Sequence, residues 1–379
     1  MLANSDANQS FQSSLASAES KVLPPATIAT DTPGKADRLL NQSLSGQTFV
    51  VPSSRMFVHP TRLLCAWESR PMQIHLPEDK KRSSPIEMTV RTGGLTQASN
   101  LQPRRYYRHA LKALYQQLAL PVRLPHSYVL DSRFDTDQNI AHIVDNILTR
   151  FLLAKRIEPA LSNLTLILRR NASPMMKQVC QLLHIPFICT DRRVQGNIVT
   201  VEAEKRSATC PILFEPYYRS LFGSLDFADY QADTPKRVFI ARKHRRKLTN
   251  EAEVEHCLQA YGFIKLYYED IPIQQQWSIA RNAEVVVGMH GAALSSLVFN
   301  VDQVKLLEIF HPGYLVDLYR HSIAAVGGKW AAVIGQLHPE VIQALDFEVK
   351  PRQFALADTT IDLGSLQMGL DYLEVGKRE

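Results

Sequence analysis

The sequence predicts an α/β protein built from two doubly wound domains, each a parallel sheet with helices on both faces. Three observations point to this fold. Apolar runs of strand length alternate with segments whose apolar residues recur at helical spacing. The alternation occurs twice, over 127–190 and over 237–335, and the polar stretch 221–236 separates the two series. The length of 379 residues is ample for two hydrophobic cores.

These observations divide the chain into four parts. Residues 1–45 are rich in Ser, Ala, Asn and Gln and are expected to form a flexible leader. An N-terminal domain is expected over 46–230 and a C-terminal domain over 231–340. The remaining tail, 341–379, is considered for packing back onto the N-terminal domain.

The first series is preceded by mixed signals, with strands expected at 48–52 and 61–67 and a helix at 104–120. The series itself predicts a strand, a helix with an isoleucine-rich apolar stripe, a strand, a helix and a strand. These elements are expected at 127–131, 139–152, 163–170, 175–183 and 185–190.

The second series predicts five strands with four intervening helices. Strands are expected at 237–242, 263–268, 284–288, 304–310 and 329–335. Helices are expected at 250–262, 273–282, directly after His290, and at 314–327, the first of them with Asn250 as its N-cap and Gly262 as its stop. In such sheets ligands bind outside the carboxyl ends of the strands.

Composition narrows the cellular setting. The net charge of +6 makes an anionic ligand or surface plausible. The five cysteines show no paired spacing, which favours a reducing compartment and argues against disulfides and a zinc site. The N-terminus lacks the pattern of a secretory signal, and no run reaches 18 apolar residues. We therefore expect a cytoplasmic protein, and we leave open its peripheral association with the inner face of the membrane.

The segment 285-VVVGMHGAALSSLVFN-300 places His290 between a strand and a helix. The start of a helix offers unpaired N–H groups and a partial positive charge, which suit an anion. Gly288 and Gly291 let the backbone approach a ligand closely, and Ala292 and Ala293 keep the first turn slim. A tight structural turn with a packed histidine explains the same residues equally well.

Two further groups fall at the same expected edge. The cationic loop 242-RKHRRKLTNEAEV-254 follows a strand, and the guanidinium groups of Arg242 and Arg246 suit phosphate oxygens. Glu308 lies among apolar strand residues, where a carboxylate at the crevice holds both hydroxyls of a ribose. A solvated basic loop and an exposed glutamate are the competing interpretations.

The helix 139-NIAHIVDNILTR-150 carries the fourth group. Asn139, His142, Asp145 and Asn146 recur at three- and four-residue spacing, opposite the isoleucine stripe. A His and an Asp one turn apart can serve as a general base and its partner. An ordinary solvated helix face is the competing interpretation.

Together these groups resemble glycosyltransferase family 61. The family's C-terminal signature, G-x-H-G-A-G-L followed by a strand with a glutamate, is matched by Gly288, His290, Gly291, Ala292, Leu294 and Glu308. Ala293 stands where the family usually has Gly. The family also has an Arg, a second Arg and then Asn-Glu, and Arg242, Arg246, Asn250 and Glu251 match this pattern. The N-terminal half of the family carries an Asn-x-x-His-x-x-Asp-like stretch, which Asn139, His142 and Asp145 match. The likeness is good over 235–312, weaker over 127–220 and absent before about residue 100.

The resemblance implies a GT-B-like fold, with two Rossmann-like domains facing a cleft, and an inverting glycosyltransferase that needs no cofactor or metal. It implies a nucleotide-sugar donor, UDP-linked, and a glycan or other hydroxyl acceptor in surface or capsular polysaccharide synthesis. Arg242, Arg246, His290 and the backbone at 291–293 would then hold the diphosphate, and Glu308 the ribose. Asn250 and Gly288 complete the nucleotide-sugar site that the resemblance implies. Asp145 is the expected base, with His142 second.

Two other functions remain open at this stage. The basic run could serve a non-catalytic protein that binds RNA or an anionic membrane surface, although the sequence contains no recognised nucleic-acid module. Steep salt dependence of binding would favour that interpretation. A degenerate transferase that holds a nucleotide without turnover is the third.

Overall fold

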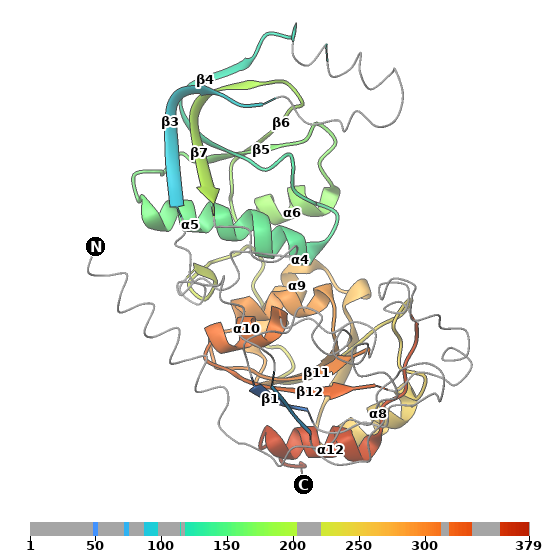
Figure 1. Cartoon of the computed structure of the whole chain (residues 1–379). Coiled ribbons are helices and arrows are strands. Elements are labelled where there is room, and N and C mark those ends of the chain that lie inside the picture. The colour runs from blue at the N-terminus through green and yellow to red at the C-terminus, as the bar shows by residue number, and fades with distance from the viewer. Residues whose placement is uncertain are drawn as a thin grey trace. The chain divides into compact units, whose positions relative to one another are not determined.

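The computed structural model divides the chain into two compact units (Figure 1). Unit 1 comprises residues 1–80, 214–223 and 230–379, and unit 2 comprises 81–213 and 224–229. The structure describes residues 48–51, 72–75, 87–97, 114, 118–202, 221–311, 318–335 and 357–378. The expected leader, the strand at 61–67 and most of the helix at 104–120 lie outside the described residues. Each unit is described by itself below.

Unit 1 is organised around a five-stranded parallel sheet in the order β12-β11-β10-β8-β9. Its strands are β8 (Arg237–Ala241), β9 (Ile264–Tyr267), β10 (Val285–Met289), β11 (Lys305–Phe310) and β12 (Lys329–Ile334). The chain adds β9 on one side of β8 and then crosses back to add β10, β11 and β12 on the other side. The direction of winding therefore reverses between β8 and β10, and ligands bind doubly wound sheets at such a reversal.

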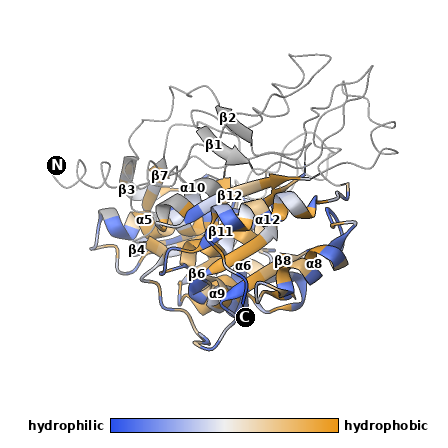
Figure 2. Ribbon diagram, turned by 90° about the horizontal axis from the view of Figure 1, so that it is seen from below, coloured by the Kyte–Doolittle hydropathy of each residue, from blue (hydrophilic) through white to orange (hydrophobic). Residues whose placement is uncertain are grey.

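Helices cover both faces of this sheet (Figure 1). They are α8 (Glu251–Gln259), α9 (Ile273–Asn282), the 3₁₀ helix η3 (Ala292–Phe299), α10 (Leu318–Ala325) and α12 (Leu363–Tyr372). α9, η3 and α10 pack on one face, and α8 and α12 pack on the other. The strands between them are apolar on both sides, which the hydropathy colouring shows clearly for β8 (Figure 2).

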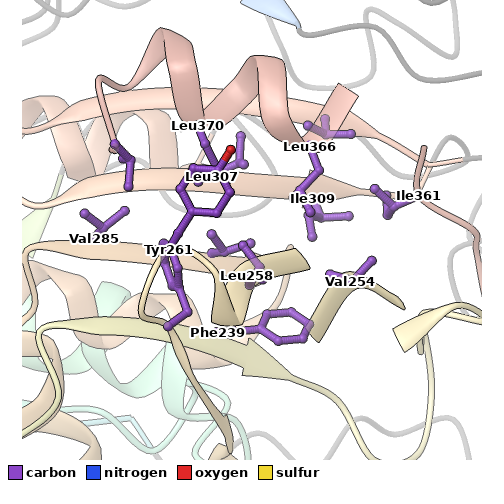
Figure 3. Close-up of a cluster of buried hydrophobic side chains, with 14 of the residues drawn as sticks. Phe239, Val254, Leu258, Tyr261, Val285, Leu307, Ile309, Ile361, Leu366 and Leu370 are labelled. Atoms are coloured by element: carbon purple, nitrogen blue, oxygen red, sulfur yellow. The ribbon is translucent and has the colours of Figure 1, made fainter. Parts of the chain in front are cut away.

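The described part of the tail, 357–378, packs on the sheet of unit 1. Ile361 and the α12 side chains Leu366 and Leu370 meet Leu307 and Ile309 of β11 (Figure 3). This differs from the expectation that the tail packs on the N-terminal domain. The reason is physical: the α8 face of the sheet needs a second apolar helix, and the leucines of α12 are spaced to supply it.

Unit 1 also contains the antiparallel pair β1 (Thr48–Val51) and β2 (Met72–His75), which the expected boundaries assigned to the N-terminal domain. β1 matches the strand expected at 48–52. β2 was not predicted, because its four residues give too short a signal.

Unit 2 is organised around a second five-stranded sheet in the order β3-β7-β4-β5-β6. Its strands are β3 (Glu87–Leu95), β4 (Val122–Asp131), β5 (Thr165–Leu168), β6 (Phe187–Cys189) and β7 (Val194–Glu202). Only β3 is antiparallel to its neighbour. Here too the winding reverses at the first strand of the parallel series, because β5 and β7 flank β4. The predicted α/β class with parallel-rich sheets is confirmed, and the face-to-face arrangement of two domains stays a prediction.

The helical segment after β4 contains an irregular turn. It consists of α4 (Ile140–His142), the π-helical turn η1 (Ile143–Leu148) and α5 (Thr149–Ile157). Thr149 closes the wide turn, since its hydroxyl donates to the carbonyl of Val144, five residues back, at 2.9 Å. A further helix of this unit, α6 (Pro174–Leu182), begins at the N-cap Ser173, whose Oγ accepts from the Met176 N–H at 3.0 Å. No helix among the described residues has the length and apolar character that crossing a membrane requires.

Candidate functional site

His290 lies at the seam between β10 and η3, at the reversal point of the sheet in unit 1. Its N–H donates to the carbonyl of Ile309 at 2.8 Å, which extends the β10–β11 pairing by one residue. At the start of η3 the Leu294 N–H donates to the Gly291 carbonyl at 3.0 Å. The N–H groups of Ala292 and Ala293 precede that bond, so they stand at the start of the helix, where an anion finds donors.

The helix expected after His290 is of the 3₁₀ type. Ser295 and Ser296 donate their hydroxyls to the carbonyls of Ala292 and Ala293, three residues back, at 2.7 and 2.8 Å. Such serine back-bonds compete with the α-helical pattern, and the tighter 3₁₀ turn accommodates them. The hydroxyls of these two buried serines are thus engaged within the segment itself.

Arg242 and Arg246 both reach the main chain of His290. Their Nη1 atoms lie 3.4 and 3.1 Å from the His290 carbonyl oxygen, so one acceptor gathers two guanidinium groups. Arg242 comes directly after β8, and Arg246 adopts a left-handed φ of 58° that turns its side chain back toward the sheet. The two cations that the sequence places four residues apart therefore converge at the β8–β10 reversal.

The rest of the basic loop is arranged differently. Lys243 pairs with Asp270 and lies over the Tyr267 ring, with its ammonium 5.3 Å from the ring centroid. His244 and Arg245 are exposed. The loop therefore directs two selected arginines inward, whereas a nucleic-acid surface would present its whole basic run to solvent.

Arg242 and Arg246 supply positive charge at this edge of the sheet, next to His290. Burial lowers the pKa of Arg242, and nearby Glu269 and Tyr319 oppose that shift. A guanidinium remains charged at neutral pH even so, because its ordinary pKa lies far above 7. Next to them, His311 has its pKa lowered to about 3 by burial and by Arg246, so this imidazole is neutral at pH 7.

Gly291 makes room for Arg242. Its φ of 168° is extended backbone that any residue adopts. A Cβ at this position would, however, collide with Nη1 of the Arg242 guanidinium. The sequence suggested that this glycine spares room for a ligand, and the structure shows that an arginine occupies that room.

We expect Gly291→Ala to displace the Arg242 guanidinium and to weaken binding of a nucleoside diphosphate about tenfold, the size of one ordinary charge-assisted hydrogen bond. The dissociation constant for UDP, measured by calorimetry, checks this. Gly376→Ala is the matched control, because a Cβ there meets nothing within 4 Å. Unchanged affinity in Gly291→Ala would show that the position of Arg242 does not matter for binding.

Glu308 lies in the middle of β11 and is completely buried. Its Oε1 is 2.5 Å from Nδ1 of His290, and its Oε2 accepts from the Trp330 indole N–H at 2.8 Å. Both carboxylate oxygens thus have partners inside the protein. This differs from the ribose contact expected from the sequence, because alternation along β11 turns Glu308 toward the face covered by η3 and α10.

Sequence reasoning missed the aromatic surroundings of His290. Its ring stacks on Phe310 with centroids 5.2 Å apart, and the Tyr319 ring lies 5.3 Å away. Gly288 pairs with Glu308 in the strand register, and a Cβ on it would press on Leu294 at 3.1 Å. The strand register would have revealed Trp330, since β12 brings it diagonally next to Glu308, but register is not readable from the sequence.

Asn250 holds the C-terminal segment in place. Its Nδ2 donates to the Ile361 carbonyl at 2.8 Å, and its Oδ1 accepts from the Ile361 N–H at 3.1 Å. Thr249 and Lys247 continue this pairing through main-chain bonds with Thr359, both at 3.0 Å. Asn250 precedes α8 without a side-chain capping bond, so its amide ties the arginine loop to the tail, where the sequence suggested a nucleotide contact.

We expect Asn250→Ala to lower the free energy of unfolding by about 2 kcal/mol, because it removes the two hydrogen bonds to Ile361, which contribute about 1 kcal/mol each. Hydrogen exchange should rise over 357–378, while the affinity for UDP stays within about twofold, because the amide is engaged with the tail. Denaturant titration and exchange mass spectrometry measure both. Weakened UDP binding with unchanged stability would instead support a direct contact between Asn250 and the nucleotide.

In unit 2, Asp145 and His142 lie on the irregular helix after β4. Asp145 is 3% exposed and belongs to the π-helical turn, whereas His142 is half-buried. The sequence placed both on a face opposite the isoleucines, and the wide turn alters that helical spacing so that Asp145 is buried with its apolar neighbours. π-Helical turns are rare and occur often at functional sites. Asn139 caps this helix, since its Oδ1 accepts from the Ala141 N–H at 2.9 Å.

Ion pairs fix the loop that leads from β4 into this helix. The buried Arg133 binds both oxygens of Asp131, and Asp135 pairs with Arg150 of α5. Burial raises the pKa of Asp135, and Arg150 opposes the shift. Asp137 pairs with Arg169 beyond β5 and accepts from the Ser173 N–H at 2.8 Å. The helix with Asp145 is therefore anchored at the carboxyl edge of the sheet in unit 2. It follows β4, the strand at which the winding of this sheet reverses.

A family match covers residues of both units. The family profile of Glycosyltransferase 61 matches residues 107–307, which is more than half of the chain and includes Asp145, Arg242 and His290. The chain belongs to glycosyltransferase family 61.

One curated relative adds detail to this membership. The EGF domain-specific O-linked N-acetylglucosamine transferase of Drosophila melanogaster is 32% identical over 90 residues. The aligned part is 22% of this chain and only 17% of that relative, so the similarity concerns a fraction of the larger protein. The membership makes this chain a glycosyltransferase.

Proposed function

We propose that the protein transfers a sugar from a nucleotide donor, UDP-linked, to a hydroxyl acceptor, with inversion and without a metal. The observation that carries this proposal is the convergence of Arg242 and Arg246 on the His290 carbonyl at the β8–β10 reversal. Two fixed guanidinium groups beside the start of η3 suit the diphosphate of such a donor.

The proposed chemistry is one displacement at the anomeric carbon. A base in unit 2 accepts the proton of the acceptor hydroxyl, and the hydroxyl oxygen forms the new glycosidic bond. The bond from the anomeric carbon to the diphosphate oxygen breaks, and the nucleoside diphosphate leaves with the electron pair. Arg242, Arg246 and the N–H groups at 291–293 stabilise the charge that grows on that leaving group.

Asp145 is the proposed base and His142 the second candidate. Both lie on the helix that is anchored at the carboxyl edge of the sheet in unit 2, which is where a catalytic group of a doubly wound domain is expected. The GT-B arrangement, with an acceptor domain and a donor domain facing one cleft, completes the proposal.

The acceptor is proposed at the level of its chemistry. The resemblance of the sequence favours a surface or capsular polysaccharide made at the inner face of the membrane, whereas the Drosophila relative, by its name, acts on EGF domains. Both classes offer a hydroxyl group, so acceptor screens should include glycans and folded protein domains.

The proposal is tested by the melting temperature of the purified protein with UDP, GDP, CDP, ADP and UMP, each with and without EDTA. A ligand at a hundred times its dissociation constant adds about 2.7 kcal/mol, enough for a shift of several degrees. We expect a rise with UDP that EDTA leaves unchanged. A rise that EDTA abolishes would contradict metal independence, and no rise with any nucleotide, together with salt-sensitive RNA binding, would favour the binding-protein alternative.

A further inference from the structure

Three buried side chains of unit 1 form a hydrogen-bonded chain that ends at the candidate site. Trp330 donates its indole N–H to one oxygen of Glu308, and the other oxygen of Glu308 faces Nδ1 of His290. The three residues are 4%, 0% and 5% exposed, respectively. They belong to three adjacent strands or their ends, so each sits on a rigid element.

The hydrogen-bonded series of side chains continues from the His290 imidazole into the protein main chain. The His290 N–H is bonded to the carbonyl of Ile309, one residue beyond Glu308 on β11, and the His290 carbonyl receives Arg246 and Arg242. Fixing the His290 side chain therefore fixes the peptide group on which both guanidinium groups rest. The stacked Phe310 ring removes the remaining freedom of the imidazole plane.

We propose that Glu308 and Trp330 are positioning residues that orient His290, and through its carbonyl hold Arg242 and Arg246 ready for a diphosphate. This inference rests on the proposed function and deepens it, because it assigns Glu308 to the diphosphate half of the donor and not to the ribose. Orienting the cations before the ligand arrives removes the cost of ordering them on binding.

The protonation pattern explains why a carboxylate is needed between these partners. An indole nitrogen only donates, and His290 presents Nδ1 to Glu308. We assign a proton to this Nδ1, so that two N–H groups point at one acidic side chain. A carboxylate accepts from both, and this bond fixes which ring nitrogen carries the proton. A glutamine of the same shape accepts from one partner and presents its own N–H groups to the other.

Glu308→Gln distinguishes positioning from ribose contact. We expect the dissociation constants of UDP and of inorganic pyrophosphate to rise by the same factor, about tenfold, because the variant disturbs the shared diphosphate site. Trp330→Phe should weaken both ligands in parallel as well. Weaker binding of UDP with unchanged binding of pyrophosphate in Glu308→Gln would overturn the inference and reinstate the ribose contact.

A matched control separates positioning from loss of stability. Leu307 is the neighbour of Glu308 on β11 and packs on the opposite face of the sheet. Leu307→Ala lowers stability without touching the chain from Trp330 to His290, so below its melting temperature it should bind both ligands as the wild type does. Parallel weakening in Leu307→Ala would overturn the inference, because any core defect would then have the same effect.

The state of His290 supplies a readout that needs no ligand. In ¹⁵N-histidine spectra of the wild type at pH 7, the signal lost in His290→Gln should show a proton on Nδ1. That signal should shift in Glu308→Gln and stay in place in Leu307→Ala. A proton on Nε2 alone would overturn the positioning role, whereas the expected signal in a protein that binds neither UDP nor pyrophosphate would overturn the proposed function instead.

Discussion

Arg242→Gln is expected to reduce sugar transfer about 100-fold, mainly through weaker binding of the donor diphosphate in the transition state. Arg242 is partly buried, and its hydrogen bond goes to the His290 carbonyl, which does not neutralise its charge. Loss of a charge-assisted bond in such a setting costs about 1.5–3 kcal/mol, and the bond strengthens as the leaving group gains charge. Initial rates of UDP release, together with the UDP dissociation constant, measure both effects.

Arg245→Gln is the matched control for this prediction. Arg245 lies in the same loop and is exposed, whereas Arg242 and Arg246 turn toward His290. We expect the Arg245 variant to keep transfer within about twofold of the wild type, since exposed charges contribute little. Equal losses in the two variants would mean that the overall charge of the loop, and not a built site, attracts the donor.

Asp145→Asn is expected to lower kcat by a factor of about 100 to 10,000, the usual contribution of a general base. The amide keeps the shape of the buried side chain but cannot take the acceptor proton. Because Asp145 belongs to unit 2 and the arginines to unit 1, binding of UDP should remain within about twofold. Steady-state kinetics and UDP calorimetry on the same preparation separate the two steps.

His142→Gln completes this comparison. If Asp145 is the base, the His142 variant should lose less activity than the Asp145 variant and should retain the pH profile of the wild type. A nearly active Asp145→Asn together with an inactive His142→Gln would transfer the role of base to His142.

Much of the fold of unit 1 follows from local sequence signals. The helix expected at 273–282 has the bounds of α9, because Ile273, Trp277 and Ala280 repeat at helical spacing and Pro272 precedes them. The five strands of its sheet are also found where expected, within one or two residues. Continuous apolar runs between polar loops identify buried parallel strands well.

The missed features depend on contacts between distant residues. The strand β7 carries Gly196 and Asn197 within an otherwise alternating segment, and its place between β3 and β4 comes from pairing with both. The π-helical turn at 143–148 gives no periodic signal of its own. The attachment of Asn250 to Ile361 joins residues 111 positions apart, so a capping signal was a natural but incomplete interpretation.

In the candidate site, too, local sequence signals were predictive, whereas contacts between distant residues were not. Residue types and spacing sufficed to place Arg242, Arg246 and His290 at one edge of the sheet, where the structure brings them together. The partners of those residues could not be predicted. That Glu308 faces His290 and Trp330, and that Gly291 accommodates Arg242, depends on strand register and on which face each side chain takes.

The most direct test of the account is a calorimetric titration with UDP and with uridine, in EDTA, of the wild type and of a double variant, Arg242→Gln with Arg246→Gln. We predict that the wild type binds UDP, binds uridine far more weakly, and that the double variant loses binding of UDP. Equal affinity for UDP in the two proteins, or no binding by the wild type, would contradict the assignment of the diphosphate to the β8–β10 reversal of unit 1.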